Sequence, residues 1–80
     1  MKKIAYSNDA LKTLSRMQPK RAALIISKID AFASGERVNV KKMQGSNRLR
    51  IRVGDDRVII EEETMTVTVI KIGPRGDVYK

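Results

Sequence analysis

The sequence predicts an α+β fold in which two helices cover one face of a twisted, mainly antiparallel sheet. Three observations lead to this prediction. Basic and apolar residues alternate strictly from Arg48 to Val53, which is typical of a strand with one buried face. Apolar residues recur at helical spacing in two segments between residues 8 and 34. A run rich in β-branched residues from Met65 to Ile72 indicates an inner strand.

Length and composition limit the possible functions. We expect residues 1–80 to form a single small domain, because 80 residues are too few for two hydrophobic cores. The formal net charge of +8 favours nucleic acid, an anionic membrane or an acidic protein as partner. The chain has no Cys and no His, which excludes disulfides, thiol nucleophiles, imidazole acid–base chemistry and the usual zinc sites. No apolar run suits a membrane span or a signal peptide, so a cytoplasmic protein is expected.

The first half of the chain predicts a short strand followed by a helical hairpin. Residues 2–6 suit a strand, and Ser7-Asn8-Asp9 supplies side-chain oxygens that cap a helix. That helix should end near Gln18, since a proline disfavours helix in the residue before it. Pro19 is suited to open the second helix, and Ser34-Gly35 to end it.

The second helix carries a continuous apolar stripe that we expect to face the core. Its members are Ala22, Ile25, Ile26, Ile29 and Phe32. The polar positions left for solvent are Lys20, Arg21, Lys28 and Asp30. Residues 36–47 show neither helical nor strand periodicity, so they are expected to form a loop.

Gly54-Asp55 predicts a two-residue hairpin turn of the glycine-first kind. The register that this turn sets pairs Val53 with Asp56, Arg52 with Arg57, Ile51 with Val58, Arg50 with Ile59 and Leu49 with Ile60. Leu49, Ile51, Val58 and Ile60 would then face the core, and the three arginines 50, 52 and 57 would share the solvent side. Directly opposed like charges cost roughly 0.2–1 kcal/mol per pair, so folding alone gives no reason to gather these arginines. A polyanionic partner would give one.

The last strand and the tail complete the predicted sheet. Val67 and Val69 should join the core under the helices, whereas Ile70 and Ile72 fall on the arginine side. The tail from Gly73 onward would cover them. An alternative interpretation is that Arg48, Arg50 and Arg52 form only the solvent-exposed face of an edge hairpin. Arg57 could likewise form an ion pair with Asp55, Asp56 or Glu61.

Three segments of the sequence resemble the RelE/ParE toxin family of bacterial type II toxin–antitoxin systems. They are Met43-Gln44-Gly45, the run from Arg48 to Ile59, and the tail from Ile72 to Tyr79. The resemblance implies a microbial-ribonuclease-like fold, a cognate antitoxin as partner, and no cofactor or metal. It also implies one of two activities: RelE-like members enter the ribosomal A site and cut messenger RNA, whereas ParE-like members poison DNA gyrase.

For the RNA-cutting members, the resemblance assigns roles to residues on the exposed sheet face and in the tail. The implied catalytic residues are Arg50, Arg52, Arg57, Arg75 and Tyr79. The implied RNA-binding residues are Lys41, Lys42, Arg48 and Lys71. The expected reaction is attack by the ribose 2′-OH on the adjacent phosphate, giving a 2′,3′-cyclic phosphate and a 5′-OH end, while guanidinium groups clamp the phosphate.

The general base is harder to assign, because the pKa of an arginine side chain is above about 12 and the side chain therefore stays protonated. Tyr79 is the remaining aromatic candidate, either as a proton acceptor or as a stacking platform for a base. The sequence departs from relatives at Asp56, where an aromatic residue is usual, and at Pro74 and Gly76. The leading interpretation is a ribosome-dependent endoribonuclease toxin, with a gyrase poison or a catalytically inactive binding module as alternatives.

Overall fold

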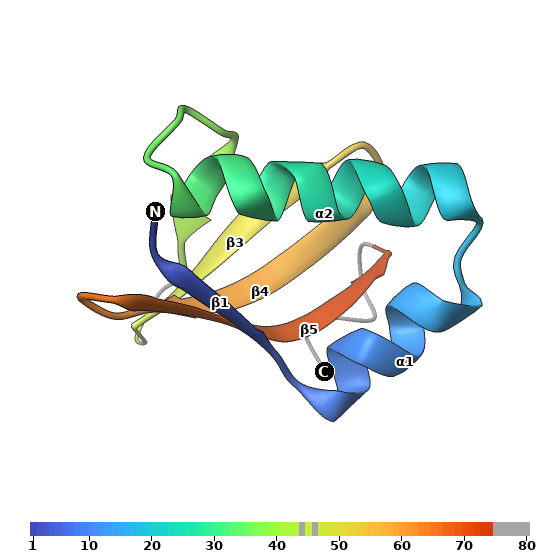
Figure 1. The fold of residues 1–80 in the computed structure, drawn as a ribbon, viewed down its shortest axis with the longest axis horizontal. Helices are drawn as coiled ribbons and strands as arrows, with labels where there is room; N and C mark the ends of the chain where they lie inside the picture. Colours follow the sequence, from blue (N-terminus) through green and yellow to red (C-terminus); the bar gives the residue numbers. More distant parts are fainter. Residues whose placement is uncertain (44, 46, 75–80) are drawn as a thin grey trace.

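The computed structural model describes residues 1–43, 45 and 47–74, so Arg75 and Tyr79 lie outside the described part. Its elements are β1 (Lys3–Tyr6), α1 (Asn8–Arg16), α2 (Pro19–Ala33), β2 (Val40–Lys42), β3 (Arg48–Val53), β4 (Asp56–Glu62) and β5 (Thr66–Pro74). The strands of the described part form one sheet in the order β1-β5-β4-β3-β2. Only the pair β1–β5 is parallel among them. Both helices lie on the same side of this sheet (Figure 1).

The helices begin and end where capping residues predict. Ser7 is the N-cap of α1, and its Oγ accepts a hydrogen bond from the Ala10 backbone N–H at 3.1 Å. Pro19 occupies the first turn of α2, and Gly35 follows its C-cap with a φ of +85°. Helix α1 packs against β5, and α2 packs against β3 and β1. Each helix therefore buries its apolar side on the sheet.

The core lies between the helices and the face of the sheet that they cover. Its buried members include Ala10, Ile25, Ile29, Ala33, Ile51, Val53, Val58, Ile60, Val67, Val69 and Ile72. Ile25 and Ile29 are fully buried, which confirms the centre of the predicted stripe. The prediction is wrong for Ile26, a residue that is 38% exposed. Ile26 lies at the flank of α2, away from the side of the helix that carries Ile25 and Ile29.

The central hairpin has the predicted register, from Leu49 opposite Ile60 to Val53 opposite Asp56. Gly54 opens the turn with a φ of +60°, a backbone conformation that favours glycine. The register sorts the side chains onto two faces. We call the face that packs on the helices the inner face, and the opposite one, which carries Arg50, Arg52 and Arg57, the outer face.

The prediction of a loop over residues 36–47 is wrong in part, because Val40–Lys42 forms the edge strand β2 beside β3. Backbone hydrogen bonds fix this strand just beyond both of its ends. The Arg52 N–H donates to the Asn39 carbonyl, and the Met43 N–H donates to the Arg48 carbonyl, each at 2.9 Å. The strand is short and has one apolar residue, so its sequence carries almost no periodic signal.

A β-bulge in β5 overturns the predicted position of Ile72. Ile59 pairs with Lys71 and Ile60 pairs with Val69, which leaves Ile70 as an extra residue between them. One extra residue reverses the alternation of every side chain that follows. Ile72 therefore joins the core on the inner face. Lys71, opposite Ile59, falls on the outer face instead.

Candidate anion-binding site

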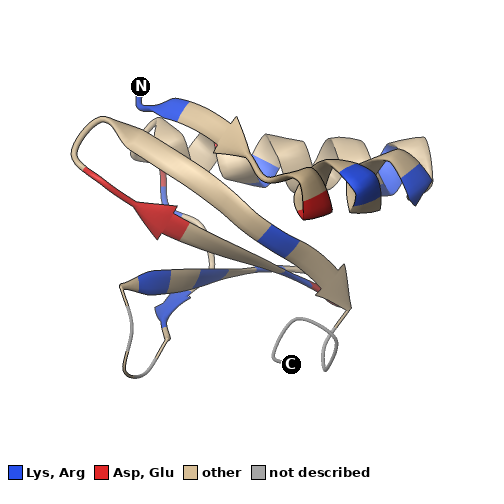
Figure 2. Cartoon of the chain, turned by 90° about the horizontal axis from the view of Figure 1, so that it is seen from below, with Lys and Arg blue, Asp and Glu red and all other residues tan. Residues whose placement is uncertain are grey.

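A small cavity opens on the outer face, over β2, β3 and β4. Its lining residues are Asn39, Lys41, Arg50, Arg52 and Arg57, and its volume is about 110 Å³. We call it the basic cavity, because four of these residues are cationic and the fifth is a neutral amide. Figure 2 shows that Lys and Arg positions are concentrated along the neighbouring strands β2 and β3. Such a concentration of like charge creates a strong local attraction for anions.

Strand pairing brings the cationic residues of the basic cavity together. Lys41 of β2 lies directly opposite Arg50 of β3, and Arg52 of β3 lies directly opposite Arg57 of β4. Directly paired residues on one sheet face have Cβ atoms about 4.5–5.5 Å apart. Four cationic residues from three strands therefore line the same cavity. Three of them are the arginines that the sequence predicts to share a face.

Arg57 is more enclosed than the sequence predicts. We expected its side chain to stand in solvent, but the residue is 8% exposed, because it lies on a strand with neighbours on both sides. Its partner on β5 is Gly73, which has no side chain to compete for the space. Its Nη1 donates to the backbone carbonyl of Asp56 at 3.2 Å. Within the described part of the chain, no carboxylate forms an ion pair with it.

Asp56, at the start of β4, is held by an ion pair that the sequence analysis missed. It is 3% exposed, and its carboxylate accepts two hydrogen bonds from Arg21 of α2. Nε of Arg21 reaches Oδ2 at 2.7 Å, and Nη2 bonds Oδ1. These hydrogen bonds, and then the negative charge of Asp56, raise the pKa of the Arg21 guanidinium. The pair fastens α2 to the hairpin turn one residue before Arg57.

Arg21 is exposed, as predicted, but the ion pair that it forms with Asp56 was not expected. It lies four residues before Ile25 and eight before Ile29, so the helical repeat places all three on the same side of α2. The register also places Asp56 on the inner face, two residues before Val58. Both signals are present in the sequence. Asn39 of the basic cavity, by contrast, has no sequence signal that marks it.

The other predicted RNA-binding residues lie around the basic cavity or away from it. Arg48 lies on the outer face, where its Nε donates to Glu61 Oε1 at 3.0 Å. Lys71 lies on the outer face of β5, opposite Ile59. Lys42 pairs with Leu49, so it alternates to the other side of β2 from Lys41. Arg75 and Tyr79, which the resemblance makes catalytic, lie outside the described residues.

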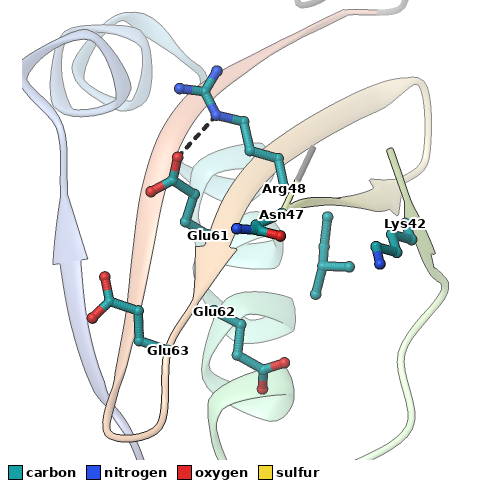
Figure 3. Close-up of a pocket in the computed structure, with 7 residues that line it drawn as sticks. Lys42, Asn47, Arg48, Glu61, Glu62 and Glu63 are labelled. Atoms are coloured by element: carbon teal, nitrogen blue, oxygen red, sulfur yellow. Dashed lines mark hydrogen bonds and ion pairs between the residues drawn. The ribbon is translucent and has the colours of Figure 1, made fainter. Parts of the chain in front are cut away.

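A larger hollow of about 550 Å³ lies at the far end of the hairpin. Its lining residues are Lys42, Asn47, Arg48, Leu49, Glu61, Glu62 and Glu63. Figure 3 shows Arg48 joined to Glu61, with the carboxylates of Glu62 and Glu63 beyond them. Three carboxylates repel a polyanion, so this hollow suits a phosphate backbone far less well than the basic cavity does.

The described residues can also be searched for a metal site and for a membrane-spanning helix. Among residues 1–43, 45 and 47–74, no three His, Cys, Asp or Glu side chains gather in a way that could hold a metal ion. Neither helix of the described part has the length and apolar character needed to cross a bilayer. The basic cavity is therefore the feature on which the functional argument depends.

Comparison with solved structures identifies the fold. A chain of the RelB–RelE antitoxin–toxin complex from Methanococcus jannaschii is 24% identical, with a TM-score of 0.76 over 94% of each chain. The isolated RelE toxin of E. coli is 19% identical, with a TM-score of 0.79 over 99% of this chain and 92% of that one. YafQ of E. coli is 12% identical, with a TM-score of 0.80 over the whole of both chains.

The sequence itself gives no such match. No family model matches the chain, and no curated protein sequence matches it. The likeness therefore lies in the three-dimensional structure, and it confirms the predicted RelE-like, microbial-ribonuclease-like fold.

Proposed function

We propose that this protein is the toxin of a type II toxin–antitoxin system, and that it cuts messenger RNA in the ribosomal A site. The observation that carries the proposal is the basic cavity, where Lys41 and three arginines converge and no lining residue is acidic. The fold supports it, since the similar solved structures include a RelE toxin. The cytoplasm, where ribosomes translate, would be the site of action.

The arginines of the basic cavity are suited to phosphoryl chemistry. Guanidinium groups donate paired hydrogen bonds to phosphate oxygens and keep their charge at any physiological pH. Arg50, Arg52 and Arg57 would hold the scissile phosphate and stabilise the negative charge that develops as the 2′-oxygen attacks. Arg75 and Tyr79 stay part of the proposed site on the resemblance alone. Arg48 and Lys71, which lie on the outer face, would contact the RNA backbone on either side, whereas Lys42 faces away from the basic cavity and is left out of the proposed RNA contact.

A cognate antitoxin would hold the toxin inactive. Several solved structures with this fold are toxin–antitoxin complexes, including the intact RelBE complex of E. coli. The net charge of +8 favours a partner segment rich in Asp and Glu, laid near the outer face. An interface of this kind weakens as salt screens its charges. Affinity that stays flat from low to high salt would contradict a charge-led interface.

The test is primer extension on messenger RNA after the protein is induced in bacteria. Discrete cuts within translated frames are expected. Arg52→Gln should reduce cleavage by roughly 10²–10³, since it removes one charged hydrogen-bond donor from the transition state. Arg16→Gln on α1 is the matched control, because that arginine lies on the helical side of the molecule. Intact messages together with accumulated gyrase–DNA breaks would instead support the gyrase alternative.

A further inference from the structure

The edge strand β2 brings a lysine into the basic cavity. Lys41 lies opposite Arg50 and lines the cavity together with Arg52, Arg57 and Asn39. Its place is set by the backbone, because hydrogen bonds at Asn39 and Met43 hold β2 in register with β3. Lys42, the next residue, alternates away from this cavity and lines the larger hollow beside Glu61, Glu62 and Glu63. Of these two adjacent lysines, only Lys41 therefore lines the basic cavity.

Chemistry separates Lys41 from the other lining residues. The three guanidiniums hold their protons too tightly to act as bases, and a neutral amide such as Asn39 does not accept a proton near neutral pH. A lysine ammonium can release its proton and then serve as a general base. Lys71 has the same chemistry, but the strands β3 and β4 separate it from Lys41, and it does not line the basic cavity.

We propose that Lys41 is the general base of the cleavage reaction, a step that rests on the nuclease function proposed above. Neutral Nζ of Lys41 takes the proton of the ribose 2′-OH while the 2′-oxygen forms a bond to phosphorus. The bond from phosphorus to the 5′-oxygen breaks, and that oxygen takes a proton from solvent. The products are a 2′,3′-cyclic phosphate and a 5′-OH, and the Lys41 ammonium returns its proton to solvent.

The surroundings of Lys41 suit this role. The charged groups that face it in the basic cavity are Arg50 and Arg52 from β3 and Arg57 from β4, and all three are cations. No carboxylate lines the cavity, so none competes with the substrate for a contact with Lys41. Lys41 is itself exposed, so a substrate hydroxyl can approach it and a released proton can reach solvent.

The test compares Lys41→Arg and Lys41→Met with the parent protein on programmed ribosomes in vitro. Lys41→Arg keeps the positive charge and removes the base, so single-turnover cleavage should fall by roughly 10²–10⁴ while binding to the ribosome is unchanged. Lys28→Arg, on the exposed side of α2, is the matched control and should cut at the parental rate. Thermal unfolding of each variant verifies that the fold is intact.

A pH–rate profile separates proton transfer from simple charge. The parental rate should rise with pH as the Lys41 ammonium loses its proton, and this limb should be absent in Lys41→Arg. If Lys41→Arg cuts at the parental rate with an unchanged profile, the proposed role of Lys41 is wrong although the nuclease function stands. If the parent protein leaves messages on ribosomes intact, the nuclease function and the role of Lys41 both fail.

Discussion

Arg21 and Asp56 are 35 residues apart in the sequence, yet the guanidinium of Arg21 binds both carboxylate oxygens of Asp56. The carboxylate is almost completely buried, whereas the arginine keeps about half of its side chain in solvent. The ion pair joins the first turns of α2 to the start of β4. It lies directly beside Arg57, the next residue, whose side chain donates to the Asp56 carbonyl.

Replacing Asp56 should destabilise the protein. Asp56→Ala removes two charge-assisted hydrogen bonds from a buried site, and we expect the free energy of unfolding to fall by about 1.5–3 kcal/mol. Urea unfolding measures this change. Asp55→Ala, at the exposed neighbouring position in the turn, is the control and should stay within about 0.5 kcal/mol.

A double-mutant cycle shows whether that loss belongs to the ion pair. Arg21→Ala should cost clearly less in the Asp56→Ala background than in the parent, because its partner has already gone. Equal costs in the two backgrounds would mean that the residues act independently.

Arg57→Gln should abolish most cleavage activity. The variant keeps a hydrogen-bonding side chain but loses the charge at the centre of the basic cavity, so a loss of roughly 10²–10³ in rate is expected. Because Arg57 is 8% exposed, its aliphatic stem is packed, and we also expect a slightly lower melting temperature. Arg37→Gln, at an exposed position before β2, is the control for both measurements. Parental cleavage by Arg57→Gln would remove this residue from the site.

The two possible roles of Tyr79, proton transfer and stacking on a base, can be distinguished by a substitution that keeps the ring. If Lys41 takes the proton, Tyr79→Phe should cut programmed ribosomes at close to the parental rate, because the ring that stacks on a base is kept. Tyr79→Ala should lose the stacking contribution, which is about 1–3 kcal/mol per base. A loss of roughly 10²–10⁴ with Tyr79→Phe would instead assign proton transfer to the phenol.

Tyr6 should make stability fall at alkaline pH. Partial burial, and then the charge of Asp30, raise the pKa of the Tyr6 phenol above its ordinary value of 10.0. The unfolded chain therefore loses this proton at lower pH than the folded one, so stability falls as pH rises above about 10. Urea unfolding of Tyr6→Phe across that range should show a shallower decline than the parent, since lysine titration is common to both. Identical slopes would show that Tyr6 does not contribute.

The parts of the fold with a strong local signal could be predicted from the sequence. The hairpin register follows from Gly54 and the strict alternation before it, and the helix ends follow from Ser7, Pro19 and Gly35. The edge strand β2 could not be predicted, because its pairing with β3 depends on contacts between segments and its three residues show no period. The bulge at Ile70 could not be predicted from the sequence either, since an extra residue can be recognised only once the pairing of β4 with β5 is known.

The candidate site divides in the same way. The alternation identifies the three arginines as neighbours, but it cannot show that Lys41 joins them, because that depends on β2. The enclosure of Arg57 depends on its place between two strands, which is a property of the whole sheet. The Arg21–Asp56 pair could have been predicted from helical spacing and hairpin register taken together, since Arg21 lies on the side of α2 that carries Ile25 and Ile29, and the register turns Asp56 toward that helix.

The order of the strands also bears on self-association. Its two edge strands, β1 and β2, expose unpaired backbone groups that could pair with the edge of another molecule. Both are short, and both carry exposed lysines, Lys3 on β1 and Lys41 and Lys42 on β2. Short strands with charged side chains are how natural sheets prevent edge-to-edge aggregation. Lys41 would thus discourage intermolecular pairing at the same edge where it approaches RNA.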